Sequence, residues 1–210
     1  METTELYLIT GVIFLLAGTV KGIVGFGLPL VSITLLTPIY GLVDAIAVMV
    51  LPAVVTNFWQ AVSGGGLIVL LRRLWPLYLL GVVSTVVAAS LLVQVDAQWP
   101  TALLGCVILI YSIGGLGAWQ LPEPGRRETW LSPVMGVITG GITGLTGVLV
   151  FPLAAYVQAL NLDRRMFFQA MGIYLLLATV ALAVVFGWQG AFPEGVTYLA
   201  LVGVVMGLIG

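Results

Sequence analysis

The sequence contains no histidine and only one cysteine, Cys106. Histidine is the side chain that most readily exchanges protons near neutral pH, and protein zinc sites are built mainly from histidine and cysteine. A lone cysteine cannot form a disulfide within the chain. We therefore expect no enzyme activity, and we assign no catalytic residue, no metal ligand and no bound cofactor.

Charged residues are also scarce, at 7% of the chain, whereas a soluble domain carries about 25%. Hydrophobic residues make up 61%, and the mean hydropathy is +1.21. So few charges cannot cover the surface of a soluble fold, so the composition indicates an integral membrane protein whose main partner is the lipid bilayer. The net charge of −1 gives no reason to expect a nucleic-acid partner.

Apolar runs follow one another along the chain, and they are continuous rather than alternating, which favours helices over the strands of a membrane barrel. The acidic start, "METTELYLIT", lacks the basic region of a signal peptide, so we expect the first run to be a retained span. The last run is still apolar at Gly210, and we expect a truncated C-terminus. The predicted runs are 6–36, 45–62, 74–95, 100–121, 130–160, 166–188 and 196–210.

The two longest runs resemble each other. "GIVG" at 22–25 is followed by Pro29, and "GLTG" at 144–147 is followed by Pro152, about 120 residues further on. Each run then leads to a short segment that contains an aspartate. The similarity predicts an internal duplication.

The predicted fold class is therefore all-α: a polytopic transmembrane helical bundle of two similar four-helix halves, each with a broken, glycine-rich first helix. Residues 1–121 form the first repeat, with about four helices. Residues 122–129, which include "PEPGRRET", form a polar linker. Residues 130–210 form the second repeat, with about three helices present.

The glycine clusters predict breaks in the helices. Glycine and proline destabilise a helix by roughly 1 and 3 kcal/mol per residue, and irregular backbone survives in a membrane only inside protein or beside water. Paired breaks in two halves point to a transporter binding site, and Lys21 beside the first break supports an anion site. Alternatively, the glycines serve close helix packing and Lys21 extends to a lipid headgroup.

Polar side chains inside the runs are few. Asn57 and Gln60 share one helix face, and they either contact a substrate or hold helices together. Thr143 and Thr146 flank Gly144 within the second break and also share a face. We expect backbone N–H groups at both breaks to donate to an anion. The candidate substrate-binding residues are Lys21, Gly22, Gly25, Phe26, Gly27, Pro29, Asn57, Gln60, Thr143, Gly144, Thr146, Gly147, Pro152 and Gln169.

Charged residues at the edges of the runs have simpler explanations. Asp44 and Asp163 are predicted to cap the helices that follow them. The arginines occur as adjacent pairs, which we interpret as loop residues that anchor the protein at the membrane interface. These pairs are Arg72–Arg73, Arg126–Arg127 and Arg164–Arg165.

Three segments resemble the TauE/SafE family of sulfite and organosulfonate exporters and related permeases: "KGIVGFGLPL" at 21–30, "LPAVVTNFWQ" at 51–60 and "GVITGGITGLTGVLVFPL" at 136–153. Where the family pattern leads us to expect further glycine, this chain has Val148 and Leu149, which predicts a tighter or more helical second break. The resemblance implies seven to nine spans and secondary transport of small, sulfur-containing or carboxylated anions, driven by an ion gradient.

The predicted function is accordingly a permease that moves small anions across a bacterial-type inner membrane by alternating access, with multiple spans. Coupling to H⁺ or Na⁺ is left open, and a homodimer is compatible with the sequence. Two alternatives remain: a passive anion channel of the same fold, and a non-transporting membrane subunit that assembles or anchors another protein.

Overall fold

The computed structural model describes residues 3–96, 98–116, 121–193 and 195–210, and no strand occurs among them. Residues 117–120, at the end of the predicted fourth run, lie outside the described residues, as do residues 1 and 2. The helices are α1 Thr3–Val24, α2 Leu28–Tyr40, α3 Leu42–Val62, α4 Leu67–Leu92, α5 Gln98–Leu116, a short 3₁₀ turn Gly125–Arg127, α6 Glu128–Thr146, α7 Leu153–Ala159, α8 Arg164–Trp188 and α9 Val196–Ile209.

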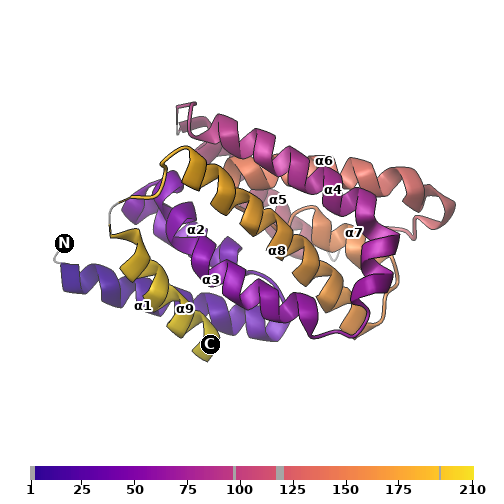
Figure 1. The fold of residues 1–210 in the computed structure, drawn as a ribbon, viewed down its shortest axis with the longest axis horizontal. Coiled ribbons are helices and arrows are strands. Elements are labelled where there is room, and N and C mark those ends of the chain that lie inside the picture. Colours follow the sequence, from indigo (N-terminus) through magenta and orange to yellow (C-terminus); the bar gives the residue numbers. More distant parts are fainter. Residues whose placement is uncertain (1–2, 97, 117–120, 194) are drawn as a thin grey trace.

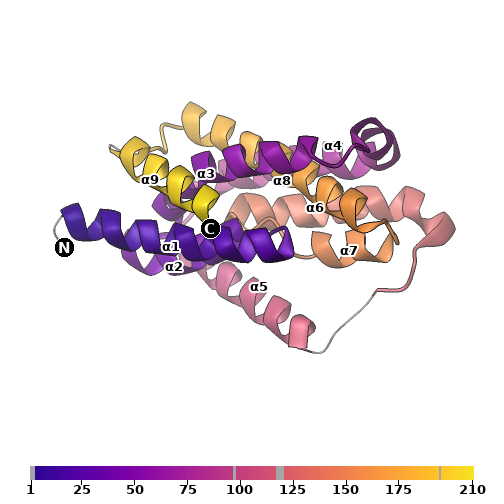
Figure 2. The same cartoon turned by 90° about the horizontal axis from the view of Figure 1, so that it is seen from below.

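Helices α3 and α8 pack against each other in the middle of the bundle (Figure 1). Helix α9 packs on α3 and α1 on one side, and α4 packs on α8 and α6 on the other. Helix α5 departs from the bundle at an angle and makes its main contact with α6 (Figure 2). Segments distant in sequence therefore meet at the centre of the molecule.

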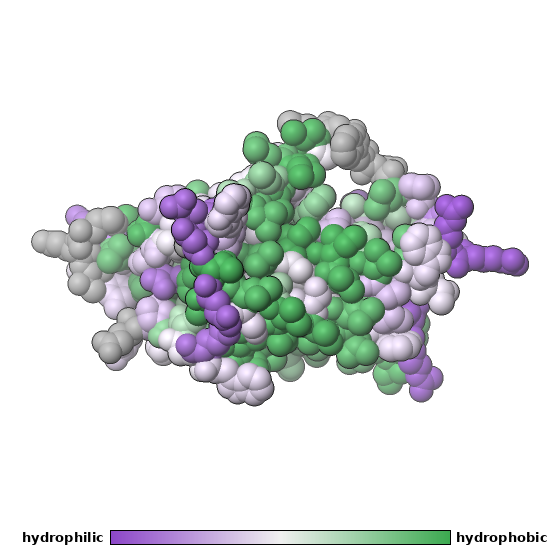
Figure 3. Space-filling view, turned by 90° about the horizontal axis from the view of Figure 1, so that it is seen from above, coloured by the Kyte–Doolittle hydropathy of each residue, from purple (hydrophilic) through white to green (hydrophobic). Residues whose placement is uncertain are grey.

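Helices α3, α4 and α8, together with residues 4–24 of α1, are long and apolar enough to cross a membrane. Large apolar side chains cover their outer surfaces; Leu8 and Val12, for example, are 66% and 57% exposed. Figure 3 shows one face of the molecule, with apolar side chains over its middle and hydrophilic side chains at one end and in a strip toward the other. This distribution is that of a protein surrounded by lipid rather than by water.

Both long predicted runs contain two helices. Run 6–36 is divided between α1 and α2, and run 130–160 between α6 and α7. The described part of residues 1–121 therefore contains α1–α5, and residues 130–210 contain most of α6 and all of α7–α9. Each half therefore has one helix more than the four and three expected, because each long run was expected to form a single span.

The interval between α6 and α7 corrects one expectation. It covers residues 147–152 and is longer, not tighter, than the interval 25–27 between α1 and α2. The side chains of Val148, Leu149 and Val150 are at most 1% exposed, so the non-helical segment itself forms part of the core. Burial of these side chains offsets the helical hydrogen bonds that the segment gives up.

Arg72 and Arg73 were predicted in a loop, but they lie within α4, just before a kink at Leu74. The Nε atom of Arg73 is 2.7 Å from Oε1 of Glu128, in the first turn of α6. Because both groups are partly exposed to solvent, we assign this pair a small contribution to stability, about 0–1 kcal/mol.

The two aspartates at the run edges differ. Asp163 is the N-cap of α8, and its Oδ1 accepts a hydrogen bond from the Met166 N–H at 2.9 Å, which confirms the predicted cap. Asp44 is not a cap, because α3 begins earlier, after Gly41. Its carboxylate lies in the first turn, where its negative charge interacts favourably with the positive end of the helix dipole.

The closest helix contact is between α4 and α6. A Cβ atom added at Gly136 or at Gly144 would come within 2.5 Å of α4. Gly141, on the same helix, has only ordinary contacts, the nearest being Ser84 Oγ at 3.5 Å. The glycines at 136 and 144 thus bring two helices into backbone contact, which is a packing function that the sequence had left as an alternative.

Candidate functional site

Lys21 lies in the last turn of α1, and only 9% of its surface is exposed. Its Nζ atom donates to Thr56 Oγ1 at 3.1 Å and to Asn57 Oδ1. Both acceptors belong to α3. Lys21 therefore points into the protein, and the alternative in which it extends to a lipid headgroup does not describe this structure.

Asn57 connects Lys21 to the centre of the bundle. Its side chain is fully buried, and its Nδ2 atom donates to Thr179 Oγ1 of α8 at 3.2 Å. The Thr179 hydroxyl in turn donates to the carbonyl of Leu175. We refer to Lys21, Thr56, Asn57 and Thr179 as the Lys21 cluster; it joins α1, α3 and α8 by side-chain hydrogen bonds.

The Lys21 cluster has no negative charge within the described residues. Both hydrogen-bond partners of Lys21 Nζ are neutral oxygens. The described carboxylate on α3, Asp44, lies about 20 Å from Asn57 along the helix. A buried ammonium without a counter-ion is costly, by several kcal/mol. The cluster is completed either by an anion or by loss of the ammonium proton.

Gln60, one turn after Asn57, holds the end of α1 against α8. Its Nε2 atom donates to the carbonyl of Gly25 at 2.6 Å and to that of Phe168 at 2.9 Å. Its Oε1 atom is buried and has no hydrogen-bond partner among the described residues. Asn57 and Gln60 thus both turn toward neighbouring helices, with Asn57 fully buried and Gln60 half-buried.

Aromatic rings cover this end of α1. Phe26 packs edge-on against Phe167, with ring centroids 6.4 Å apart, and Phe167 packs against Phe168 at 5.5 Å. Gly25 has φ of 86°, and a Cβ atom there would overlap the Phe168 ring. Together with the Gln60 bridge, these rings hold the end of α1 against α8.

Gln169 connects α8 to the turn between α3 and α4. Its Oε1 atom accepts from the Gly66 N–H at 2.7 Å, and its Nε2 atom donates to the Ala61 carbonyl at 2.8 Å. Both ends of the amide are therefore engaged by backbone. In this structure Gln169 joins α8 to the turn between α3 and α4, and its contact with a substrate stays a prediction.

We expect Gln169→Leu to lower the free energy of unfolding by about 1–3 kcal/mol, because one buried and one half-buried backbone group lose their side-chain partner. Gln158→Leu is the matched control, since Gln158 is exposed on α7 and should change stability little. Thermal unfolding of both variants in detergent measures the difference. Equal stability of the two variants would contradict this role of Gln169.

The candidate residues at the second break do not join the Lys21 cluster. The Thr143 hydroxyl donates to the Val148 carbonyl at 3.1 Å, and the Thr146 hydroxyl donates to the Ile142 carbonyl at 2.7 Å. Gly144 packs against α4, Gly147 packs against Ile33 and Ile46, and Pro152 is the N-cap of α7. The two hydroxyls hold the chain where α6 ends.

The expected backbone donors are also partly occupied. The Gly25 N–H donates to the Lys21 carbonyl at 2.6 Å, and the Gly147 N–H donates to the Thr143 carbonyl at 2.7 Å. These hydrogen bonds end α1 and α6, so neither N–H is available to an anion here. In this structure both N–H groups are engaged within the chain, and donation from the backbone of the two breaks to an anion stays a prediction.

The other candidates of the first break surround the start of α2. Gly27 is the N-cap of α2, with φ of 115°, and Pro29 is buried in the first turn. A Cβ atom added at Gly22 would lie 3.4 Å from the carbonyl oxygen of Gly210. These residues shape the chain near Lys21.

Two residues of the cluster, Thr56 and Thr179, were missed by the sequence reasoning. Thr56 directly precedes Asn57, and Thr179 lies 122 residues after Asn57. A signal for Thr179 was present, because this separation is close to the offset of the predicted repeat. Applying that offset to Asn57 would have identified the hydroxyl that it contacts.

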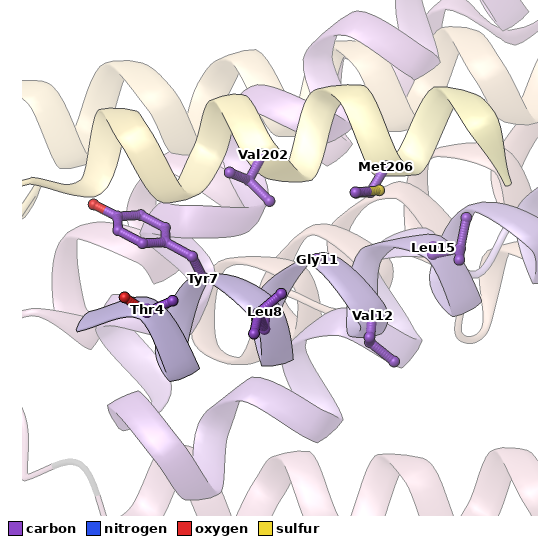
Figure 4. Close-up of a pocket in the computed structure, with 8 residues that line it drawn as sticks. All are labelled: Thr4, Tyr7, Leu8, Gly11, Val12, Leu15, Val202 and Met206. Atoms are coloured by element: carbon purple, nitrogen blue, oxygen red, sulfur yellow. The ribbon is translucent and has the colours of Figure 1, made fainter. Parts of the chain in front are cut away.

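A groove of about 330 Å³ lies elsewhere, between α1 and α9 (Figure 4). Figure 4 shows Tyr7 and Leu8 of α1 near Val202 and Met206 of α9. The lining residues are uncharged, and Leu8 is 66% exposed on the outer surface. The groove therefore suits hydrocarbon, and we keep the Lys21 cluster as the candidate site.

The fold and the buried cluster define a helical integral membrane protein with a lysine in its interior. The chain belongs to the family described as sulfite exporter TauE/SafE, which matches residues 10–210. This family comprises membrane transporters. Comparison with curated proteins gave no match, and neither did comparison with solved structures.

Proposed function

We propose that this protein is a secondary transporter that carries small anions across the inner membrane by alternating access, and that the anion pairs with Lys21. Sulfite, organosulfonates and related sulfur-containing or carboxylated compounds are the proposed substrates. The observation that carries the proposal is a buried lysine whose described hydrogen-bond partners are all neutral. An anion would supply the missing negative charge.

The arrangement of helix contacts supports two similar halves. Helix α1 packs on α9 as α6 packs on α4, and α3 packs on α9 as α8 packs on α4. Helices α3 and α8 contact each other. This order is what a pseudo-twofold relation between α1–α4 and α6–α9 would produce, with α3 and α8 beside the axis.

Individual contacts support the same relation with a shift of 122 residues, the separation of Asn57 and Thr179. A Cβ atom at Gly81 would meet Tyr174, and a Cβ atom at Gly203 would meet Pro52. A shift of 122 residues takes Gly81 to Gly203 and Pro52 to Tyr174. The two contacts are therefore equivalent under the shift. Duplicated transporters commonly place their substrate at the interface of the repeats.

The same shift takes Lys21 to Thr143, so the second half has an uncharged side chain at the position that corresponds to Lys21. In the closed structure the described members of the Lys21 cluster are at most 9% exposed. Access therefore requires movement, and the non-helical intervals 25–27 and 147–152 are the proposed hinges. Separation of Gln60 from Gly25 and Phe168 would open the cluster on one side.

We expect millimolar anions to raise the melting temperature of the wild-type protein by several degrees, since saturation at 100 Kd stabilises by about 2.7 kcal/mol. The panel is sulfite, thiosulfate, sulfoacetate, taurine and short carboxylates. Lys21→Gln should lose the shift, and Lys21→Arg, which keeps the charge, should retain part of it. An equal shift in melting temperature for Lys21→Gln would show that Lys21 is not part of the anion site.

A further inference from the structure

We propose that Lys21 also carries the proton of the transport cycle: it is a neutral amine in the closed, empty protein, and it gains one proton when the anion binds. An anion and a proton would then cross the membrane together. This inference rests on the proposed function, because it assigns the coupling ion of the same site.

The first support is the geometry of the Lys21 cluster. Lys21 Nζ is buried against Thr56 and Asn57, both of which offer oxygen atoms without a formal charge. Removal of a lysine from water disfavours its ammonium form unless an opposite charge lies within about 4–6 Å. A neutral amine can make the same two contacts, since it still has two N–H donors.

The second support is the distance of the described charged groups from Lys21. On its own helix, Glu5 lies about 24 Å away along the axis, and Asp44 of α3 lies about 20 Å from Asn57. On α8, Arg164 lies about 22 Å from Thr179 along the helix. The other titratable groups on the elements packed around Lys21 are Tyr7 of α1, Tyr40 of α2, Tyr174 and Arg165 of α8, and Tyr198 of α9.

The tyrosines do not change this conclusion, because a phenol is neutral near pH 7. Tyr40 shares a hydrogen bond with Thr10 at 2.9 Å, and the Tyr174 ring lies against Gly81 of α4. Arg164 is positive and lies over the Phe168 ring, 5.5 Å from its centroid. Among the described residues, therefore, no negative group is placed to hold a charge on Lys21.

The coupling follows from linkage. The neutral amine, one anion and one proton from the open side combine to give an ammonium–anion pair, so charge and atoms balance without a further reactant. The bound anion favours the ammonium, and equally the proton favours the anion. Anion affinity should therefore rise as the pH falls, until the empty site is also protonated. Release of the anion on the other side returns the proton there.

Isothermal calorimetry with thiosulfate tests the inference, because this anion does not itself take up a proton near neutral pH. Titrations at one pH in two buffers with different ionisation enthalpies give the number of protons taken up per anion. We expect a value approaching one for the wild-type protein. Lys21→Arg should bind thiosulfate with no proton uptake, since its guanidinium is already charged.

The outcomes separate the inference from the function on which it rests. Thiosulfate binding without proton uptake by the wild-type protein would overturn the proton role and leave the anion site intact. No binding of thiosulfate, sulfite or sulfoacetate would overturn both. The wild-type titration alone tests the proton role of Lys21, even if the Lys21→Arg protein does not fold.

Transport in vesicles gives a second, independent measurement. An inward thiosulfate gradient should acidify vesicles that contain the protein and a trapped pH-sensitive dye, without added sodium. Vesicles with Lys21→Met protein should show no acidification, and protein-free vesicles give the leak. Uptake that requires sodium and leaves the internal pH unchanged would overturn the inference.

Discussion

Asn57→Asp is expected to reduce anion uptake by about 100-fold or more, which corresponds to roughly 3 kcal/mol. The aspartate carboxylate would occupy the position of the Asn57 amide oxygen, which now accepts from Lys21 Nζ. A carboxylate at this position forms a charge-assisted pair with the lysine and acts as a permanent internal counter-ion. The anion would then have to displace a group that is covalently part of the protein.

The measurement is the initial rate of uptake into vesicles, with Asn57→Ala as the matched variant. Asn57→Ala removes the amide but leaves Lys21 without a counter-ion, so it should retain more uptake than Asn57→Asp. The melting temperature of Asn57→Asp should be at least that of Asn57→Ala, because the aspartate keeps the contact with α1. Wild-type uptake by Asn57→Asp would rule out the Lys21 cluster as the anion site.

Gly144→Val is expected to destabilise the protein by about 3 kcal/mol, the upper part of the range for overpacked cores. A Cβ atom at Gly144 would lie 2.5 Å from Ala88 Cβ and 2.6 Å from the Thr85 carbonyl oxygen. Both are held by α4, and a backbone atom cannot turn away as a long side chain can. The helices α4 and α6 would have to separate.

Gly141→Val provides the control, because it makes the same change on the same helix. The nearest atom to a Cβ at Gly141 is Ser84 Oγ, at 3.5 Å, which is an ordinary contact. Its melting temperature should stay within a few degrees of that of the wild type, and unfolding in detergent compares the two variants. Similar losses for both would attribute the effect to valine in a helix rather than to the α4–α6 contact.

The class of fold was predictable from composition, because a chain with 7% charged residues has too few polar groups for a surface in contact with water. Lys21 and Asn57 were identified as candidates for a similar reason: polar groups are costly in such a chain and therefore informative. That these two side chains touch was not predictable. Their contact depends on how α1 crosses α3, which is decided by side-chain packing along both helices.

The second break shows why residue type alone did not identify a site. Thr143 and Thr146 have hydroxyls that suit a ligand, yet both donate to backbone carbonyls where α6 ends. A threonine hydroxyl satisfies a local carbonyl as readily as it satisfies a substrate, and the sequence is the same in both cases. Gln169 is a similar case, because its side chain hydrogen-bonds to two backbone groups.

The packing of α1 on α9 has a consequence for biosynthesis. The backbone of Gly18 lies against that of Gly207, roughly 190 residues later in the chain, and such distant contacts close slowly. Helix α1 therefore enters the bilayer long before its neighbour has left the ribosome. Until α3 and then α8 arrive, Lys21 lacks its partners, so the nascent chain carries an unsatisfied polar group that insertion factors and membrane proteases can recognise.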